Sequence, residues 1–249
     1  MTLTARARAR YARQLVLPEL GADGQAKLAA GRVLIAGLGG LGTPAARYLA
    51  GAGVGMLRLV DPDEVALDNL HRQILYTEDD VGKSKSQAAA AHLARVNSAI
   101  EVEALPVFFA PENAAEMLAG CHLAIDATDT FAARIALNRA AVAAGVPLIH
   151  GAAEGFEGQV TVFWPAGGAP CYECLYPPTG TGGGGCAERG VLGPVPGLIG
   201  TLQALEAIKL IAGIGDVLCG RLLRFEARGA AFRISRIVPD PACRVCGGS

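Results

Sequence analysis

The stretch GLGGLG at residues 37–42, directly after the apolar run VLIA at residues 33–36, decides the fold. It matches the GxGxxG fingerprint, in which glycines allow a tight turn and a close backbone approach to phosphates at a helix N-terminus. Asp61 closes the next apolar run, where a carboxylate can accept hydrogen bonds from ribose hydroxyls. We therefore predict an adenosine-containing nucleotide, with a purely structural turn as the alternative. The loop alone does not separate NAD from ATP. Its fingerprint glycines are Gly37, Gly39 and Gly42.

The composition is that of a globular, enzyme-like chain. Of its 249 residues, 51% are hydrophobic and 18% are charged, and the formal net charge is −1. This balance excludes a disordered or polyanion-binding chain, so we expect no nucleic-acid partner. The basic start, MTLTARARAR, lacks the apolar core of a secretory signal, and no uninterrupted stretch of about 18 apolar residues follows. We expect a short N-terminal arm, a cytoplasmic location and no membrane partner.

Strand-like and helical runs alternate through residues 30–150. Such alternation predicts an α/β fold with a doubly wound, Rossmann-like, mostly parallel sheet and helices on both faces. The expected strands are 33–38, 56–61, 101–109, 122–128 and 147–152. The expected helices are 43–53, 84–97, 112–120 and 131–145.

The pattern changes in residues 151–249. Three strand-like runs, at 158–164, 221–227 and 232–238, predict a partly antiparallel extension of the sheet. Residues 197–213 predict a helix with one apolar face, formed by Leu198, Leu202, Leu205, Ile208 and Ile211. We interpret 1–249 as one domain, with a helical arm at 1–29 and a nucleotide-binding part at 30–150.

Charged and polar side chains gather after the ribose carboxylate. Asn69 and Arg72 follow it closely, and Lys85 begins a predicted helix. Hydride transfer needs no such set, whereas nucleotidyl transfer does, because charge on the phosphate oxygens must be neutralised. Asp129 ends a predicted strand and offers a carboxylate to Mg²⁺, although it could instead cap the helix that begins near Thr130. Their joint placement after a glycine loop favours nucleotidyl transfer.

Four of the seven cysteines form two CxxC pairs, Cys171/Cys174 and Cys243/Cys246. Two such pairs are the usual way to build a tetrahedral four-cysteine zinc site. The 68 residues between them exceed the spacing of a simple zinc ribbon, and a redox role is the alternative. Cys186 lies in the glycine-rich stretch 177–187, which we expect to be a mobile loop with an accessible thiol.

Together these motifs resemble a known family over nearly the whole chain: the bacterial sulfur-carrier adenylyltransferases (ThiF/MoeB/HesA), which are relatives of the ubiquitin-activating enzymes. The stretches that carry the resemblance are RYARQ (10–14), GLGGLG, DPDEVALDNLHRQ (61–73), KSKSQ (83–87), DATD (126–129), the two CxxC pairs and TLQALEAIK (201–209). GTPAARYLAGAGVG (42–55), TLQALEAIK and the terminal CRVCGGS look most similar to ThiF, the thiamine-pathway member.

The resemblance implies an adenylyltransferase that uses ATP and Mg²⁺. It would adenylate the C-terminal glycine carboxylate of a ubiquitin-like sulfur-carrier protein ending in Gly-Gly, releasing pyrophosphate, for sulfur transfer in thiazole synthesis. Residues 151–249 would then bind the carrier and zinc. Because the chain ends at Ser249 without room for a rhodanese domain, we expect a separate sulfur donor protein. A MoaD-type carrier in molybdopterin synthesis is the alternative, and an NAD-dependent oxidoreductase or an inactive binding homologue is more remote.

Matching motifs also imply roles for single residues. Asp61 would hold the ribose, and Asp129 would bind Mg²⁺. Arg13 would reach the nucleotide of the other subunit in a homodimer. The phosphates would be contacted by Asn69, Arg72 and Lys85. The full implied ATP-binding set is Gly37, Gly39, Gly40, Gly42, Asp61, Asp68, Asn69, Leu70, His71, Arg72, Lys85, Asp129 and Thr130.

The resemblance also bears on the cysteines, and it has two departures. It supports structural zinc at Cys171, Cys174, Cys243 and Cys246. Cys186 matches the position at which ThiF-type proteins join covalently to their carrier through sulfur. The family commonly has asparagine where this chain has Thr130, which puts one nucleotide or metal contact in doubt. Lys83 adds a positive charge that the resemblance does not explain.

Overall fold

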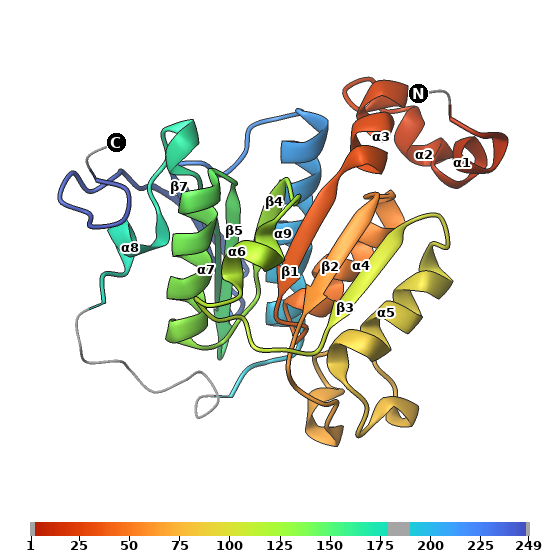
Figure 1. The fold of residues 1–249 in the computed structure, drawn as a ribbon, viewed down its shortest axis with the longest axis horizontal. Helices are drawn as coiled ribbons and strands as arrows, with labels where there is room; N and C mark the ends of the chain where they lie inside the picture. Colours follow the sequence, from red (N-terminus) through yellow and green to blue (C-terminus); the bar gives the residue numbers. More distant parts are fainter. Residues whose placement is uncertain (1–2, 179–189, 248–249) are drawn as a thin grey trace.

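A single mixed sheet organises the computed structural model, which describes residues 3–178 and 190–247 (Figure 1). Within those residues the sheet has eight strands in the order β3-β2-β1-β4-β5-β6-β7-β8. The strands are β1 (Arg32–Ala36), β2 (Met56–Val60), β3 (Glu101–Leu105), β4 (Leu123–Asp126), β5 (Leu148–Glu154), β6 (Glu157–Phe163), β7 (Arg221–Glu226) and β8 (Ala231–Arg236). Strands β1 to β5 pair in parallel, and β5 to β8 are antiparallel. The predicted fold class is therefore confirmed.

Helices cover both faces of the sheet (Figure 1). One hydrophobic cluster joins α4, α5 and α9 to one face, and a second cluster joins α6 and α7 to the other. The chain begins with three short helices, α1, α2 and α3. The α-helices in the described part of the chain are α1 (Ala5–Arg10), α2 (Ala12–Leu15), α3 (Gly21–Ala30), α4 (Gly42–Ala52), α5 (Lys85–Val96), α6 (Ala114–Leu118), α7 (Phe131–Ala144), α8 (Tyr172–Leu175) and α9 (Pro194–Ala212).

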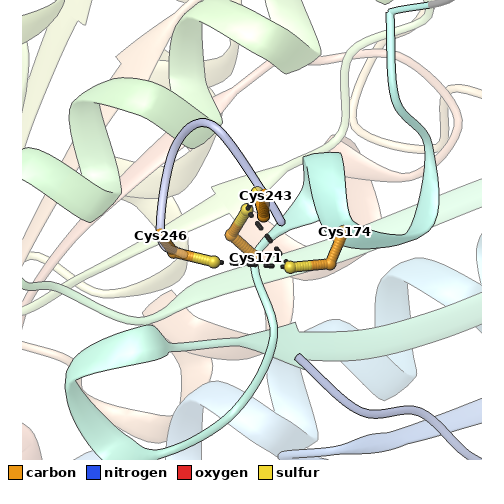
Figure 2. Close-up of side chains that lie close together, drawn as sticks. All are labelled: Cys171, Cys174, Cys243 and Cys246. Carbon is orange, nitrogen blue, oxygen red and sulfur yellow. Dashed lines mark hydrogen bonds between the residues drawn. The ribbon is translucent and has the colours of Figure 1, made fainter. Parts of the chain in front are cut away.

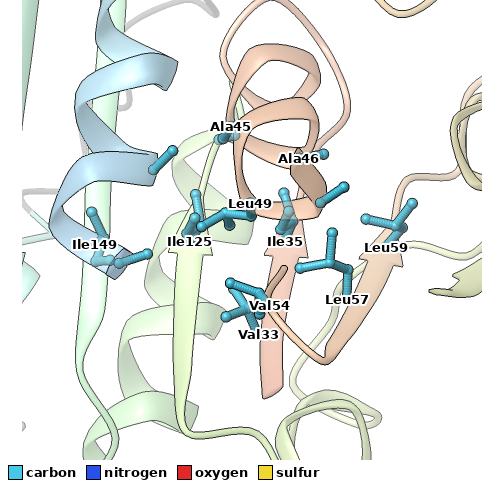
Figure 3. Packing of buried hydrophobic residues seen from close by; sticks show 14 of the residues in the cluster. Val33, Ile35, Ala45, Ala46, Leu49, Val54, Leu57, Leu59, Ile125 and Ile149 are labelled. Carbon is cyan, nitrogen blue, oxygen red and sulfur yellow. The ribbon is translucent and has the colours of Figure 1, made fainter. Parts of the chain in front are cut away.

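Strand β1 shows why the sequence folds as a layered sheet. Its residues Val33 and Ile35 pack with Leu49 of α4 in one cluster, as Figure 3 shows. The alternate residues Leu34 and Ala36 pack in the other cluster. Because successive side chains of a strand point to opposite faces, a strand covered on both sides has to be apolar throughout. The run VLIA meets that requirement.

Helix α9 corrects the predicted apolar face. Leu205 is 48% exposed, whereas Ile199 and Gln203 are fully buried. The helix is apolar nearly all round, so the spacing of large side chains does not identify its buried face. Small residues identify the buried face, because they let the backbone of α9 approach α4. A Cβ at Gly200 would overlap the carbonyl oxygen of Leu41.

By length and composition alone, α9 is the one helix in the described ranges that could cross a membrane. An 18-residue window of it has a mean hydropathy of 1.4, and 50% of that window is buried inside the fold. Core helices pass the same test. The window also contains Gln203, Glu206 and Lys209, which interrupt the apolar run.

Strand β3 is shorter than the run predicted at 101–109. It ends at Leu105, directly before Pro106, which has no N–H to donate to a neighbouring strand. The next residues leave the sheet, so that Phe108 is 73% exposed while Phe109 is buried. This turns part of a predicted strand into a loop at the carboxyl edge of the sheet.

Candidate active site

A cavity of about 850 Å³ opens at the carboxyl ends of the parallel strands. It lies where β1 and β4 are neighbours and the strand order reverses, which is where doubly wound sheets bind ligands. Its volume is that of a typical small-molecule site. Most of the predicted nucleotide residues line it: Gly37, Gly39, Gly40, Asp61, Asp68, Asn69, His71, Arg72, Lys85, Asp129 and Thr130.

Three of the described residues predicted to bind ATP or to take part in catalysis do not line this cavity. Gly42 begins α4, and a Cβ there would overlap the carbonyl oxygen of Gly37, so this glycine serves helix packing. Leu70 is half-buried against the hydrophobic cluster. Arg13 is exposed on α2, next to Gln14, which bonds the C-terminal end of α4 at the opposite edge of the sheet. Cys186 lies outside the described residues, as does most of its predicted loop.

Asp61 ties the glycine loop to the end of β2. Its carboxylate accepts the N–H of Leu38 at 2.6 Å and the N–H of Asp63 at 2.9 Å. Burial raises the pKa of Asp61, while the nearby charge of Lys85 opposes that rise. Each carboxylate oxygen can accept more than one hydrogen bond, so both keep capacity for ribose hydroxyls.

Two cationic side chains and one amide side chain line the cavity from the part of the chain between β2 and the first residue of α5. The Nζ of Lys85 lies 2.9 Å from a carboxylate oxygen of Asp63. Arg72 donates from Nη1 to the carbonyl oxygen of Asp68 at 2.9 Å. Asn69 is buried and donates to the carboxylate of Asp68 at 3.0 Å. This arrangement provides donors of both kinds, charged and neutral, for phosphate oxygens.

Lys83 has a structural explanation that the sequence did not supply. Its Nζ lies 3.3 Å from the carboxylate of Asp80, outside the cavity. The same carboxylate contacts the Nε2 of His92 at 2.7 Å and the N–H of Thr77 at 3.0 Å. Lys83 therefore forms a largely exposed ion pair at the surface and does not line the cavity.

Asp129 and Thr130 occupy different roles at the start of α7. Thr130 is the N-cap, and its Oγ1 accepts the N–H of Ala133 at 3.3 Å. The alternative that Asp129 caps the helix is therefore wrong. The Asp129 side chain is exposed and lines the cavity. An accessible carboxylate beside a phosphate site is what Mg²⁺ requires, so this residue fits a metal role.

Sequence reasoning missed further residues of this cavity. Arg134 lines it and donates from Nε and Nη2 to the carbonyl oxygen of Thr128, at 3.2 Å and 2.9 Å. Its position one helical turn after Thr130 was a usable signal, because residues four apart share a helix face. Phe108 also lines the cavity, and it lies in the second half of the predicted strand 101–109, which the chain forms as a loop.

The four cysteines of the two CxxC pairs meet in space (Figure 2). Their sulfur atoms all lie within 4.8 Å of one another, and three of the separations are 3.8, 3.6 and 3.3 Å. A tetrahedral zinc site with the usual Zn–S bonds places its sulfurs about 3.8 Å apart. All four residues are free of disulfide bonds. The cluster therefore fits zinc, with no position left open for catalysis.

Local structure shifts the pKa values of the thiols in this cluster in different directions. Burial raises the pKa of Cys171 to about 11. Burial acts on Cys243 in the same direction, but hydrogen bonds from the backbone N–H groups of Cys246 and Val245 and with the side chains of Cys171 and Cys174 together outweigh it and lower the pKa of Cys243 to about 7. Backbone donors of this kind stabilise the thiolate, which is the form that ligates a metal.

Helix α7 holds the first CxxC pair in place. The side-chain oxygen of Asn138 accepts the N–H of Tyr172 at 2.9 Å. Arg139 donates to both carboxylate oxygens of Glu173, at 2.9 Å and 3.0 Å. Glu173 is buried, so this bidentate contact compensates a charge that would otherwise be costly to bury.

The sheet, the cavity and the cysteine cluster are those of an α/β protein with a nucleotide-sized cavity and a four-cysteine cluster that could bind zinc. The model of the ThiF family matches residues 11–245. The chain belongs to the ThiF family.

Curated relatives agree with this assignment. The chain is 44% identical over 244 residues to a "Sulfur carrier protein adenylyltransferase" of Thermus thermophilus, covering 96% of this chain and 90% of the relative. It is 45% identical over 240 residues to the "Sulfur carrier protein ThiS adenylyltransferase" of Escherichia coli K12, covering 96% and 95%. It is 48% identical to "Adenylyltransferase and sulfurtransferase MOCS3" of Mus musculus, but spans only 52% of that protein. The chain is an adenylyltransferase of an ATP-using family.

Solved structures share the fold. A crystal structure of E. coli MccB with MccA-N7isoASN superposes with a TM-score of 0.85 at 25% identity, covering 96% of this chain and 75% of that one. Another, of E. coli MccB with ATP, gives a TM-score of 0.82 at 26% identity, covering 96% of this chain and 74% of that one.

Proposed function

We propose that this protein adenylates the C-terminal glycine carboxylate of a ubiquitin-like, ThiS-type sulfur carrier, using ATP and Mg²⁺, for sulfur transfer in thiazole synthesis. The observation that carries the proposal is that Arg72, Lys85 and Asp129 share one cavity with the glycine loop. The relatives from T. thermophilus and E. coli, whose names specify sulfur-carrier proteins, support the choice of substrate.

The proposed reaction brings two anions together. A carboxylate oxygen of the carrier attacks the α-phosphorus of ATP, the bond to the bridging oxygen breaks, and pyrophosphate leaves. Arg72 and Lys85 offset the repulsion and stabilise the negative charge that accumulates on the phosphate oxygens. Asp129 would hold Mg²⁺, which neutralises phosphate charge when it is bound. Asp61 orients the nucleotide through its ribose.

The cavity suits a thin, flexible tail. Its wall along β5 is built from the small residues Gly151, Ala152 and Ala153, and Gly190 also lines the cavity. A Gly-Gly terminus carries no side chains and can pass along such a wall to the nucleotide. Bulkier C-terminal residues would meet backbone there.

Four further assignments belong to this proposal. Arg13 is exposed and does not line its own cavity, so we assign it to the cavity of the other subunit in a homodimer. Zinc at the four cysteines would secure the C-terminal segment. Sulfur would come from a separate donor protein in the cytoplasm, and Cys186 would be the candidate for a covalent link to the carrier.

ATP–pyrophosphate exchange with ThiS-type and MoaD-type carriers, supplied separately, tests the proposal. We expect exchange that depends on the ThiS-type carrier and on its free terminal glycine. Exchange with the MoaD-type carrier alone would indicate a role in molybdopterin synthesis instead. Exchange with neither carrier, from protein that binds ATP, would refute carrier adenylation.

A further inference from the structure

A buried carboxylate–imidazole pair lies directly behind the cavity. Asp126 ends β4 and His150 lies on β5, and their side chains are 0% and 1% exposed. The Nδ1 of His150 is 2.7 Å from Oδ2 of Asp126. An ionised carboxylate only accepts hydrogen bonds, so Nδ1 carries the proton and donates it. Neither residue belongs to the predicted site.

Asp126 shapes the turn that leads to Asp129. Its Oδ1 accepts the N–H of Thr128 at 3.1 Å and the hydroxyl of Thr128 at 2.7 Å. Its carbonyl oxygen accepts from Nε2 of Gln203 at 2.7 Å. Thr128 in turn accepts both donors of Arg134, and the next residue is Asp129. One buried carboxylate therefore fixes the backbone that presents the proposed metal ligand.

Burial alone would raise the pKa of Asp126. The hydrogen bond and charge of His150, the charge of Arg134 and the hydrogen bond from Thr128 together outweigh burial and hold that pKa below its ordinary value. The pair therefore keeps Asp126 in the ionised form, which can accept from Thr128 with one oxygen and from His150 with the other.

The surroundings of His150 indicate which of its atoms matters. The ring lies 5.1 Å from the ring of Tyr172 in an edge-on contact and 5.8 Å from the ring of Phe163. Its Nε2 is buried and has no hydrogen-bond partner among the described residues. A buried polar atom without a partner is costly, and an apolar side chain would avoid that cost. What histidine adds here is the donor at Nδ1.

We propose that His150 is a positioning residue for the metal site: by holding Asp126, it sets the turn 126–129 that presents Asp129 to Mg²⁺ and ATP. The inference rests on the proposed function, in which Asp129 binds the metal. His150 does not line the cavity, so its role is like that of the outer residues that orient metal ligands in other proteins.

The test compares two substitutions at one position. His150→Asn keeps a donor at the place of Nδ1, whereas His150→Leu removes it. Calorimetry measures the dissociation constant of α,β-methylene ATP with and without Mn²⁺, and the ratio of the two is the metal-dependent gain. We expect His150→Leu to reduce that gain about 10–100-fold. Affinity without metal stays at the wild-type value in both variants, and His150→Asn keeps most of the gain.

His92→Leu is the matched control. It removes a histidine–aspartate contact of the same 2.7 Å length, to Asp80, and neither residue lines the cavity. We expect its metal-dependent gain to equal that of the wild type. If His150→Leu does not fold, Thr128→Val removes only the hydroxyl bond to Asp126 and is expected to lower the gain in the same direction.

The outcomes separate the two ideas. If Asp129→Asn keeps the full gain, the proposed metal role of Asp129 is wrong, and the inference falls with it. If Asp129→Asn loses the gain while folded His150→Leu or Thr128→Val keeps it, the function stands and the role of His150 is refuted. Loss in His150→Leu together with rescue in His150→Asn supports the proposal.

Discussion

Replacing Lys85 with methionine removes one positive charge from the cavity and retains most of the carbon stem that packs there. The Lys85 side chain is 8% exposed, but its partner Asp63 is 61% exposed and stays hydrated when left alone. The broken ion pair is therefore worth less than about 1 kcal/mol of unfolding free energy. For a chain of this size, that corresponds to a shift in Tm of about 2–4 °C.

The effect on the reaction is expected to be much larger. Two anions meet at the α-phosphorus, and loss of one preorganised stabilising group costs about 10²–10³ in rate, or about 2.7–4 kcal/mol. The variant also removes the charge that opposes the burial-raised pKa of Asp61, so the pKa of that carboxyl rises further. We therefore expect Lys85→Met to fold almost as stably as the wild type but to catalyse very little exchange.

Carrier-dependent ATP–pyrophosphate exchange and thermal unfolding measure the two effects separately. Lys83→Met is the control, because it is the same substitution two residues away, at a lysine that is 60% exposed and pairs with Asp80 outside the cavity. We expect wild-type exchange from that control. Exchange at the wild-type rate in folded Lys85→Met would refute the assignment of Lys85 to the phosphates.

Three other predictions concern the glycine loop, the metal centre and the buried pair. Gly42→Ala places a Cβ on the carbonyl oxygen of Gly37, so urea unfolding should show a loss of about 1–3 kcal/mol or more, and an unchanged midpoint would contradict the packing role. Cys243→Ser removes one of four sulfur ligands, and metal analysis should find the purified variant without its zinc, whereas full occupancy would argue against the four-cysteine site. Because the pKa of Asp126 is lowered in the fold, the unfolded state binds more protons as pH falls below about 4, and wild-type stability should decline there. Asp126→Asn should lack that part of the decline, and an identical pH dependence in both proteins would contradict it.

Much of the fold was predictable from the chain because its strands and helices carry local signals. Strands buried on both faces read as apolar runs, and VLIA before GLGGLG is one of them. The glycine fingerprint, Asp61 and the placement of Asp129 after a strand located the cavity at the carboxyl edge. Those inferences depended on residues close together in sequence, whose relative positions are set by the local backbone of a strand, turn or helix.

The features that were missed depend on contacts between distant segments. Asp126 and His150 are 24 residues apart and meet because β4 and β5 are neighbours. The buried face of α9 is chosen by its contact with α4, so its exposed Leu205 looked like a core residue in the sequence. Phe108 reached the cavity because Pro106 ended a strand early. The spacing of residues within one segment does not predict which distant segment it will contact.

Helix α7 links the cavity to the first cysteine pair, and the number of residues between its two contacts fixes their relative positions. Thr130 caps it at the cavity, and Asn138, eight residues on and about 12 Å along the axis, holds the segment of the first cysteine pair. One inserted residue between them would turn Asn138 by about 100° and lift it away from Tyr172. Substitutions on the outer side of this interval are tolerable to the fold, but insertions and deletions are not. A design that transfers this site to another nucleotide-binding sheet has to keep the number of residues between Thr130 and Asn138.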